Sequence, residues 1–371
     1  STNVFKISNS GPEITFETDG NNTYQKSQST KIIVTAGGSP VDTSTLKYVW
    51  VTSATSTTAP NISFTSGSTY TKSDGTGNYY LKVTACDIVG NCETKVSKVF
   101  KLDNTAPTIT FGTNGNSSAL NTQTSTINVV DYHAGGNEET YKYIWSTSES
   151  ATPNTTFISG NNYSQSSGNG NYYLRAYACD VAGNCTTNTS NKFLLDNTAP
   201  SCNYSGENTT WTTNNVSVTV TCSDTNGCKT NKSTNTWSYT SGTHKIEAIS
   251  YEIEDSAGNT TTCSKTASIY VDKDGPSTPS CSAPVVSGIN TTGSIQAASE
   301  SIDAGVGGVT YRYLINNTGT TPANTNSGFT TSRTFERACG RSYYGYVYAQ
   351  DSLGNKTAVV YCGSGADAAN S

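Results

Sequence analysis

The sequence predicts an all-β fold in which four β-sandwich domains follow one another along the chain. Three observations predict it: a short motif that recurs four times, proline-containing linkers at similar intervals, and short segments in which polar and apolar residues alternate. Alternating segments bounded by turn residues are typical of antiparallel strands. We expect no long helix, because no segment keeps a helical period of apolar residues.

The linkers define the expected domains. The sequence DNTAP occurs at Asp103–Pro107 and at Asp196–Pro200, and Pro12 and Pro276 stand in related segments. Units of 76–95 residues separate these prolines. This length suits a seven-stranded sandwich that buries its own core, which excludes a solenoid of short repeats. The expected division is a strand or remnant of an upstream unit or anchor at 1–11, followed by domains at 12–107, 108–200, 201–276 and 277–371.

Strands can be placed in the first repeat and matched to the second. Lys31–Ala36 reads as strand B, Leu46–Val51 as strand C around Trp50, Tyr79–Ala85 as strand F and Lys95–Lys101 as strand G. Tyr141–Trp145 repeats the strand C pattern in the second unit. β-Branched and aromatic residues at alternating positions favour pleated, half-buried strands.

Composition excludes several classes of function. Charged residues are 13% of the chain and the net charge is -5, with 22 Lys and Arg, so no basic footprint for nucleic acid is present. No apolar stretch approaches the ~18 residues that a membrane-spanning helix needs. Aromatic residues reach 10% and alternate with polar ones, which argues against disorder.

The recurring motif is Asp-x-x-Gly-Asn between two strands. The Asp side chain can bond a backbone N–H two residues on, and Gly tolerates positive φ, so a tight structural turn is the favoured interpretation. The alternative is a calcium site formed by Asp87, Asn91 and Asp103, because Ca²⁺ takes six to eight oxygens. No other cofactor or metal is expected. The turn residues are Asp87, Gly90, Asn91, Asp180, Gly183, Asn184, Asp255, Gly258, Asn259, Asp351, Gly354 and Asn355.

Eleven cysteines indicate a disulfide framework and an extracytoplasmic compartment. Two pairs flank the turn motif directly, where facing Cβ atoms lie ~4.5–5.5 Å apart, close to disulfide distance. The zinc alternative is disfavoured, because the C-x5-C spacing is not that of structural zinc sites and the chain has two His. Because eleven is odd, one thiol, for which Cys339 is the candidate, is expected to be free, linked to another chain or paired outside this sequence. The expected pairs are Cys86 with Cys92, Cys179 with Cys185, Cys202 with Cys263, Cys222 with Cys228, and Cys281 with Cys362.

No catalytic constellation is recognisable, so the chain is not expected to be an enzyme. His133 and His244 belong to different repeats, and neither stands beside a nucleophile in a known motif. Tyrosines recur at equal positions of the repeats, which favours a role in the core. The last unit has extra tyrosines near basic residues, so a ligand surface is placed there at Tyr343, Tyr344, Tyr346 and Arg341.

The four turn motifs and the DNTAP linkers resemble the bacterial immunoglobulin-like (Big-type) repeats of cell-surface and adhesin proteins. The resemblance covers nearly the whole chain and implies four immunoglobulin-like sandwiches in tandem. It also implies an extracellular location, at a bacterial cell surface or secreted, and a stalk or adhesive role. The first expectation is therefore a structural stalk or surface-appendage subunit built of disulfide-stapled repeats.

Two alternatives stay open beside the stalk. One is an adhesin that binds host glycan or protein through its terminal domain, and the other is the accessory region of a secreted enzyme. Expected partners are other copies of the chain or cell-surface proteins and glycans, without nucleic acid and without a membrane span in this chain. Residues 4–16 align with residues 99–111, so residues 2–8 are also a candidate for strand exchange that would build a filament.

Overall fold

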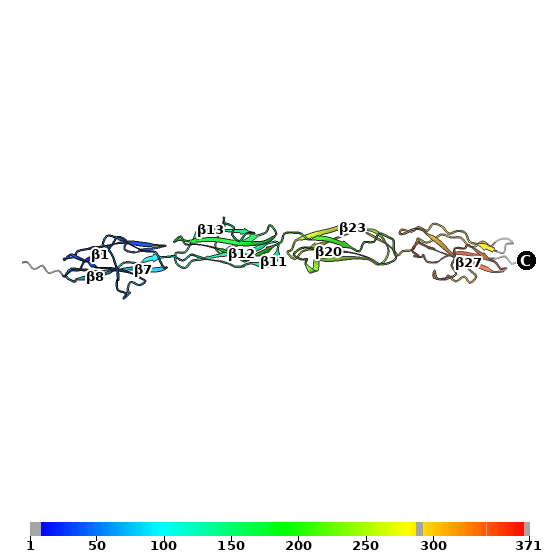
Figure 1. Cartoon of the computed structure of the whole chain (residues 1–371). Coiled ribbons are helices and arrows are strands. Elements are labelled where there is room, and N and C mark those ends of the chain that lie inside the picture. Colours follow the sequence, from blue (N-terminus) through cyan, green and yellow to red (C-terminus); the bar gives the residue numbers. More distant parts are fainter. Residues whose placement is uncertain (1–8, 287–291, 339, 367–371) are drawn as a thin grey trace, which may run out of the picture. The chain divides into compact units, whose positions relative to one another are not determined.

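The computed structural model describes residues 9–286, 292–338 and 340–366. Their chain folds into two compact units, Ser1–Asn197 and Thr198–Ser371, and each unit contains two β-sandwiches (Figure 1). We number the sandwiches 1 to 4 in chain order. The all-β tandem of immunoglobulin-like sandwiches predicted from the sequence is confirmed. No helix in the described part of the chain is long and apolar enough to cross a membrane.

Sandwich 1 packs a three-stranded sheet against a six-stranded one. The expected strand Lys31–Ala36 corresponds to β3, which begins earlier and ends at Thr35. Leu46–Val51 lies within β4, which also begins earlier. The core between the sheets contains Ile14, Ile32, Leu46, Leu81 and Val83. The first sheet is formed by β1 (Glu13–Phe16), β3 (Gln28–Thr35) and β6 (Thr69–Lys72). The second is formed by β2 (Asn21–Gln25), β9 (Phe100–Leu102), β7 (Gly77–Asp87), β4 (Val41–Val51) and β5 (Ile62–Ser63), with β8 (Cys92–Val96) beside β7.

Sandwich 2 repeats this topology strand for strand. Its core includes Ile109, Ile127, Leu174 and Phe193. One sheet consists of β10 (Thr108–Phe111), β12 (Gln123–Val130) and β15 (Asn162–Gln165). The other consists of β11 (Asn116–Leu120), β18 (Phe193–Leu195), β16 (Gly170–Asp180), β13 (Gly136–Ser146) and β14 (Thr155–Thr156), with β17 (Cys185–Thr189) beside β16.

Lys95–Lys101 was predicted to form one continuous strand G in the first repeat, and this prediction is wrong. The chain pairs with β7 as β8, leaves it at Ser97, and returns as β9. Ser97 causes the break, because its hydroxyl accepts a hydrogen bond from the Leu81 N–H at 2.8 Å in place of a strand neighbour. Ser190 makes the equivalent bond to Leu174 at 2.9 Å in sandwich 2.

Sandwich 3 is smaller and lacks a counterpart of β4 and β13 among its described residues. One sheet is formed by β19 (Ser201–Ser205), β20 (Val216–Ser223) and β21 (Thr234–Tyr239). The other is a two-stranded sheet of β22 (Thr243–Glu254) and β23 (Thr260–Asp272). A short 3₁₀ turn, η1 (Thr230–Lys232), stands between β20 and β21.

Sandwich 4 has five strands among its described residues. Its main sheet contains β25 (Thr310–Asn316), β27 (Ser342–Gln350) and β28 (Val360–Ala366). The facing sheet contains β24 (Thr292–Ser294) and β26 (Thr334–Glu336). Residues 1–8 and Cys339, for which strand exchange and an unpaired thiol were expected, lie outside the described residues.

Candidate functional site at the domain junctions

The Asp-x-x-Gly-Asn motif forms the same turn in all four sandwiches. In the first, Asp87 Oδ1 accepts hydrogen bonds from the N–H groups of Val89 and Asn91 at 3.0 and 2.8 Å. The Asn91 side chain donates to Asp87 Oδ2 at 2.9 Å, and Gly90 has a φ of 93°. The Asp-to-Asn side-chain bond recurs in the other three turns at 2.7–2.8 Å. The Asp is therefore an acceptor at the centre of the turn.

These hydrogen bonds decide the ionisation of Asp87. Burial acts to raise the pKa of its carboxyl group, but the side-chain and backbone N–H groups of Asn91 and the backbone of Val89 stabilise the charged form. Together they hold the pKa of Asp87 below its ordinary value. The carboxylate therefore stays charged at neutral pH although only 2% of the residue is exposed.

All five cysteine pairs expected from the sequence are joined in the structure. Cys86–Cys92 and Cys179–Cys185 occupy directly opposite positions in their hairpins, with Cα atoms 4.0 Å apart. Cys202–Cys263 connects the two sheets of sandwich 3 over a sequence separation of 61. The remaining bridges, Cys222–Cys228 and Cys281–Cys362, have separations of 6 and 81.

The calcium site expected from Asp87, Asn91 and Asp103 is wrong as a cluster. Asp87 ends β7, whereas the residue before Asp103 pairs with Gly77 at the start of β7. An 11-residue strand at ~3.3 Å per residue spans about 30 Å. Asp87 and Asp103 therefore belong to opposite ends of sandwich 1 and cannot bind one ion.

Asp103 instead meets two carboxylates of the next sandwich. It follows β9, while Asp131 follows β12 and Asp180 starts the turn after β16. Ligand oxygens of all three lie within 4.8 Å of one another. Asp103 and Asp180 are 0% exposed, and Asp131 is half-buried. Asp103 Oδ2 accepts the Ala134 N–H at 2.9 Å, and the Asn184 side chain donates to the Asp103 carbonyl at 2.9 Å.

The junction of sandwiches 3 and 4 has the same arrangement. Asp272, Asp303 and Asp351 bring their carboxylate oxygens within 4.8 Å of one another. Asp272 Oδ2 accepts the Val306 N–H at 2.9 Å, and the Asn355 side chain donates to the Asp272 carbonyl at 3.1 Å. Each contact matches one made at the first junction. The Asp-x-x-Gly-Asn turn thus has a second role, which is to hold the preceding linker.

Asp131 and Asp303 were missed in the sequence, although a signal for them exists. Both begin the pattern Asp-x-x-x-Gly-Gly, and each carboxylate accepts the N–H of the first of these glycines, Gly135 at 2.7 Å and Gly307 at 2.6 Å. In sandwich 1, the residue that follows the corresponding strand β3 is Ala36, which carries no carboxylate. Among the described residues, no carboxylate cluster forms around Asp87.

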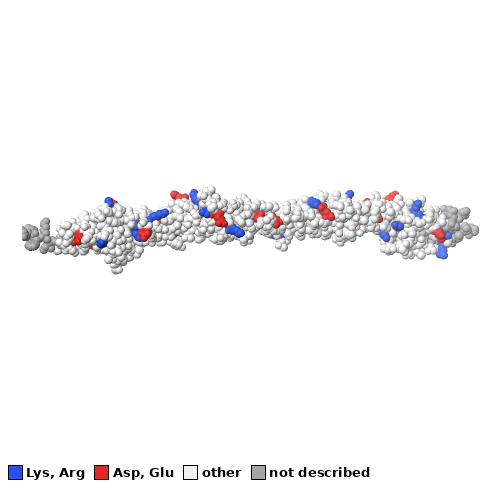
Figure 2. Space-filling view, in the orientation of Figure 1, with Lys and Arg blue, Asp and Glu red and all other residues white. Residues whose placement is uncertain are grey.

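The charge of these clusters is not balanced by the protein. Within the described ranges, no Lys, Arg or His forms an ion pair with the six carboxylates of the two junctions. Lys26 passes near Gly183 without pairing with them. Charged side chains are sparse on the face drawn in Figure 2, and neither sign gathers there. Three carboxylates so close together suit a hard divalent cation with oxygen ligands.

The ligand surface expected at Tyr343, Tyr344, Tyr346 and Arg341 is wrong. Tyr346 is 0% exposed because it packs with Phe329 and Tyr348, and Tyr343 is 8% exposed with its ring 4.7 Å from that of Phe335. Tyr344 is half-buried, and its ring lies 6.4 Å from that of Tyr361. Arg341 alone is exposed. Tyr343 and Tyr346 therefore belong to the core of sandwich 4 and are not available to a ligand.

Comparison with known proteins finds solved structures of low sequence identity. No protein-family model and no curated protein matches the chain. Among solved structures, it is similar to the fibronectin(III)-like modules of Clostridium thermocellum CbhA, with 15% identity over 49% of this chain and 94% of that one, and a TM-score of 0.22. It is also similar to the human Desmocollin-1 ectodomain, with 12% identity, coverage of 94% and 78%, and a TM-score of 0.27.

Proposed function

We propose that the chain is a structural spacer of a bacterial cell surface, built of Big-type immunoglobulin-like repeats and without catalytic activity. Its tandem sandwiches and five disulfides fit an extracellular, structural or adhesive repeat protein. A surface low in charge suits a spacer, because its interactions depend little on salt. We further propose the segments 12–107, 108–200, 201–276 and 277–371 as its domains.

The junction clusters are the observation that carries the proposal. A spacer must hold its two ends at a fixed distance, so the angle between neighbouring domains has to be fixed. At each of two junctions, three carboxylates from two domains surround one point. They belong to the linker Asp, the first residue of Asp-x-x-x-Gly-Gly and the turn Asp. A Ca²⁺ ion at that point would cancel their repulsion and join the domains, supplying positive charge where no basic side chain of the described residues pairs with them. Asp103, Asp131 and Asp180 would hold it at the first junction, and Asp272, Asp303 and Asp351 at the second.

Calcium titration tests this proposal directly. We expect calorimetry of the whole chain to detect at least two sites, with dissociation constants in the ~0.1–1 mM range of extracellular calcium modules. At 100 times the dissociation constant, bound Ca²⁺ should raise the free energy of unfolding by about 2.7 kcal/mol at each site. Asp131→Asn should weaken the first site by at least ~10-fold, the loss that even outer-shell changes cause.

Asp42→Asn is the matched control. Asp42 is also half-buried and caps a turn, with its carboxylate accepting from the Ser44 N–H at 3.0 Å, but it belongs to no carboxylate cluster among the described residues. Asp42→Asn should leave both sites unchanged. Absence of Ca²⁺ binding at millimolar concentration, or equal loss in the two variants, would contradict the calcium sites.

A further inference from the structure

Within the described part of the chain, strand β22 of sandwich 3 has a neighbour on one side only. Its counterparts β7 and β16 stand inside their sheets, with β4 or β13 on one side and the last strands of the domain on the other. Of the described strands, β22 pairs with β23 alone. Sandwich 3 is the shortest expected unit, at 76 residues, and the strand corresponding to β4 is the part that it lacks.

Part of this open edge is covered by the loop that replaces the missing strand. The Lys229 N–H donates to the Glu254 carbonyl at 2.9 Å, and Cys228 forms an isolated bridge with Asp255. Lys232 forms an ion pair with Glu252 at 2.9 Å. Charged groups and a covering loop protect an edge from other chains. Residues 252–255 are therefore shielded.

No loop contact of this kind is made by the preceding stretch, Ile246–Tyr251, among the described residues. Ile246 is 54% exposed, and Ala248 and Ser250 are exposed on the outer face. Its sequence, IEAISY, contains no Pro or Gly, and its single charge, Glu247, pairs with His244 of the same strand at 2.8 Å. Short segments with high β propensity and low charge pair readily with other strands.

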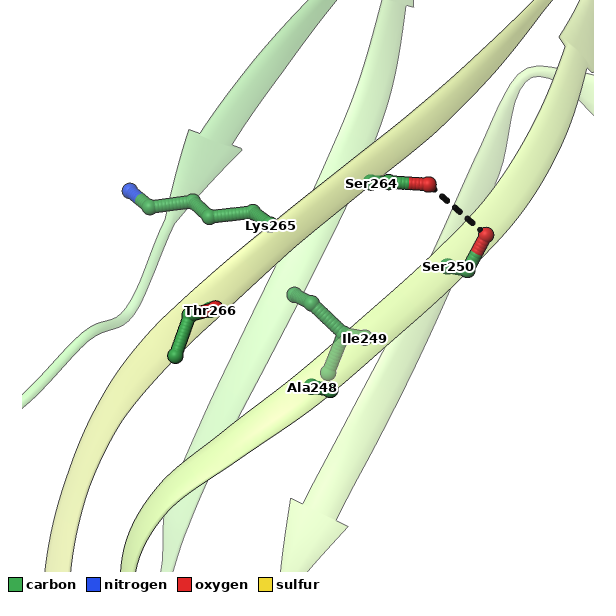
Figure 3. A pocket seen from close by; sticks show the side chains of 6 residues that line it. All are labelled: Ala248, Ile249, Ser250, Ser264, Lys265 and Thr266. Atoms are coloured by element: carbon green, nitrogen blue, oxygen red, sulfur yellow. Dashed lines mark hydrogen bonds between the residues drawn. The ribbon is translucent and has the colours of Figure 1, made fainter.

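The surface beside this edge is flat and made of small side chains. Figure 3 shows Ala248 and Ser250 on β22 next to Ser264 and Thr266 on β23, with the two serine hydroxyls 3.0 Å apart. These residues line a shallow hollow of ≈ 450 Å³. Among the described residues no strand occupies this side of β22, so a second strand can approach it.

We propose that β22 pairs with β22 of a second copy of the chain, antiparallel and about a two-fold axis at Ala248. The shielded end limits the overlap to Lys245–Tyr251, whose centre is Ala248. In this register each Ala248 faces its copy, Ile246 faces the partner's Ser250, and Glu247 faces the partner's Ile249. A two-fold axis at Glu247 would oppose two carboxylates, which is unfavourable. The product is a four-stranded sheet across two chains, formed by strand addition.

This pairing requires only a second copy as partner. Antiparallel pairing about a two-fold axis is self-complementary, so both copies contribute the same seven residues. Such an overlap is at the small end of interface sizes. We therefore expect weak dimerisation, appearing at about 0.1 mM. The dimer would tie two spacers side by side, and it does not depend on the proposed calcium sites.

Sedimentation equilibrium of the full chain tests the pairing, with free thiol blocked by iodoacetamide in every sample. Wild type should change from monomer to dimer between about 1 µM and 1 mM. Ala248→Glu and Ala248→Lys each place like charges on the two-fold axis, and each should weaken dimerisation by at least ~10-fold. An equimolar mixture of the two variants should restore it, because Glu then faces Lys.

Ser217→Glu is the matched control. Ser217 is exposed on β20, which has a neighbour on both sides within the same sandwich, so its charge should leave dimerisation unchanged. A near-ultraviolet circular dichroism spectrum checks that each variant is folded. The proposal is overturned by a wild type that stays monomeric at 1 mM. It is also overturned by a dimer that both Ala248 variants retain, or by variants that remain monomeric when mixed.

Discussion

Removing the Cys202–Cys263 bridge by combining Cys202→Ala with Cys263→Ala should destabilise sandwich 3 by about 4 kcal/mol. A cross-link over a loop of 61 residues restricts the unfolded chain by about this amount in the chain-entropy model. The bridge joins β19 in one sheet to β23 in the other, and Cys263 is 1% exposed in the core. Sandwich 3 has little else to compensate, because its second sheet has two strands.

Hydrogen exchange followed by mass spectrometry across a denaturant series measures this loss domain by domain. Cys86→Ala with Cys92→Ala is the comparison, since it removes a bridge of separation 6 and should cost sandwich 1 about 2 kcal/mol. Protection should fall in β19–β23 for the first variant and in β7 and β8 for the second. Equal losses in the two sandwiches would show that loop length does not govern these bridges.

Strands with alternating polar and apolar residues could be predicted from the sequence. The complete set of strands in each sandwich could not. Leu46–Val51 and Tyr141–Trp145 share an aromatic pattern that predicted β4 and β13 correctly. The third repeat contains no such segment, and its shorter length was a visible sign that a strand was absent. The break in strand G was not predictable in the same way, because Ser97 interrupts pairing through one side-chain contact with a distant residue.

The junction site was half predictable. The turn residues were identified because their function is local, with Asp87 bonding Val89 and Asn91 within one motif. The predicted calcium site was wrong because it grouped Asp87 and Asp103 for their closeness in the sequence. An 11-residue strand, β7, separates the two ends of the domain at which they lie. The correct partner, Asp131, lies in the next domain, and only its repetition as Asp303 before Gly-Gly could have indicated it.

Phe193→Ala should destabilise sandwich 2 by about 3–5 kcal/mol, the usual cost of emptying a large buried aromatic position. Phe193 is 0% exposed on β18, and its ring meets that of Trp145 edge-on at 4.9 Å. β18 is only three residues long and is held between β11 and β16, so it has few other contacts to retain it. The loss should appear as a lower denaturant midpoint for the fluorescence of Trp145.

Tyr132→Ala is the control for this change. It deletes an aromatic ring of the same sandwich that is 87% exposed, so its cost should stay within about 0.5 kcal/mol. We expect β18 to detach first in Phe193→Ala. The buried side chain of Gln123 donates to the Leu194 carbonyl at 2.6 Å, and this hydrogen bond requires β18 to stay in place. Hydrogen exchange in Phe193→Ala should therefore rise in β11 and β18 before the rest of sandwich 2. Uniform exchange across sandwich 2 would mean that β18 does not open separately.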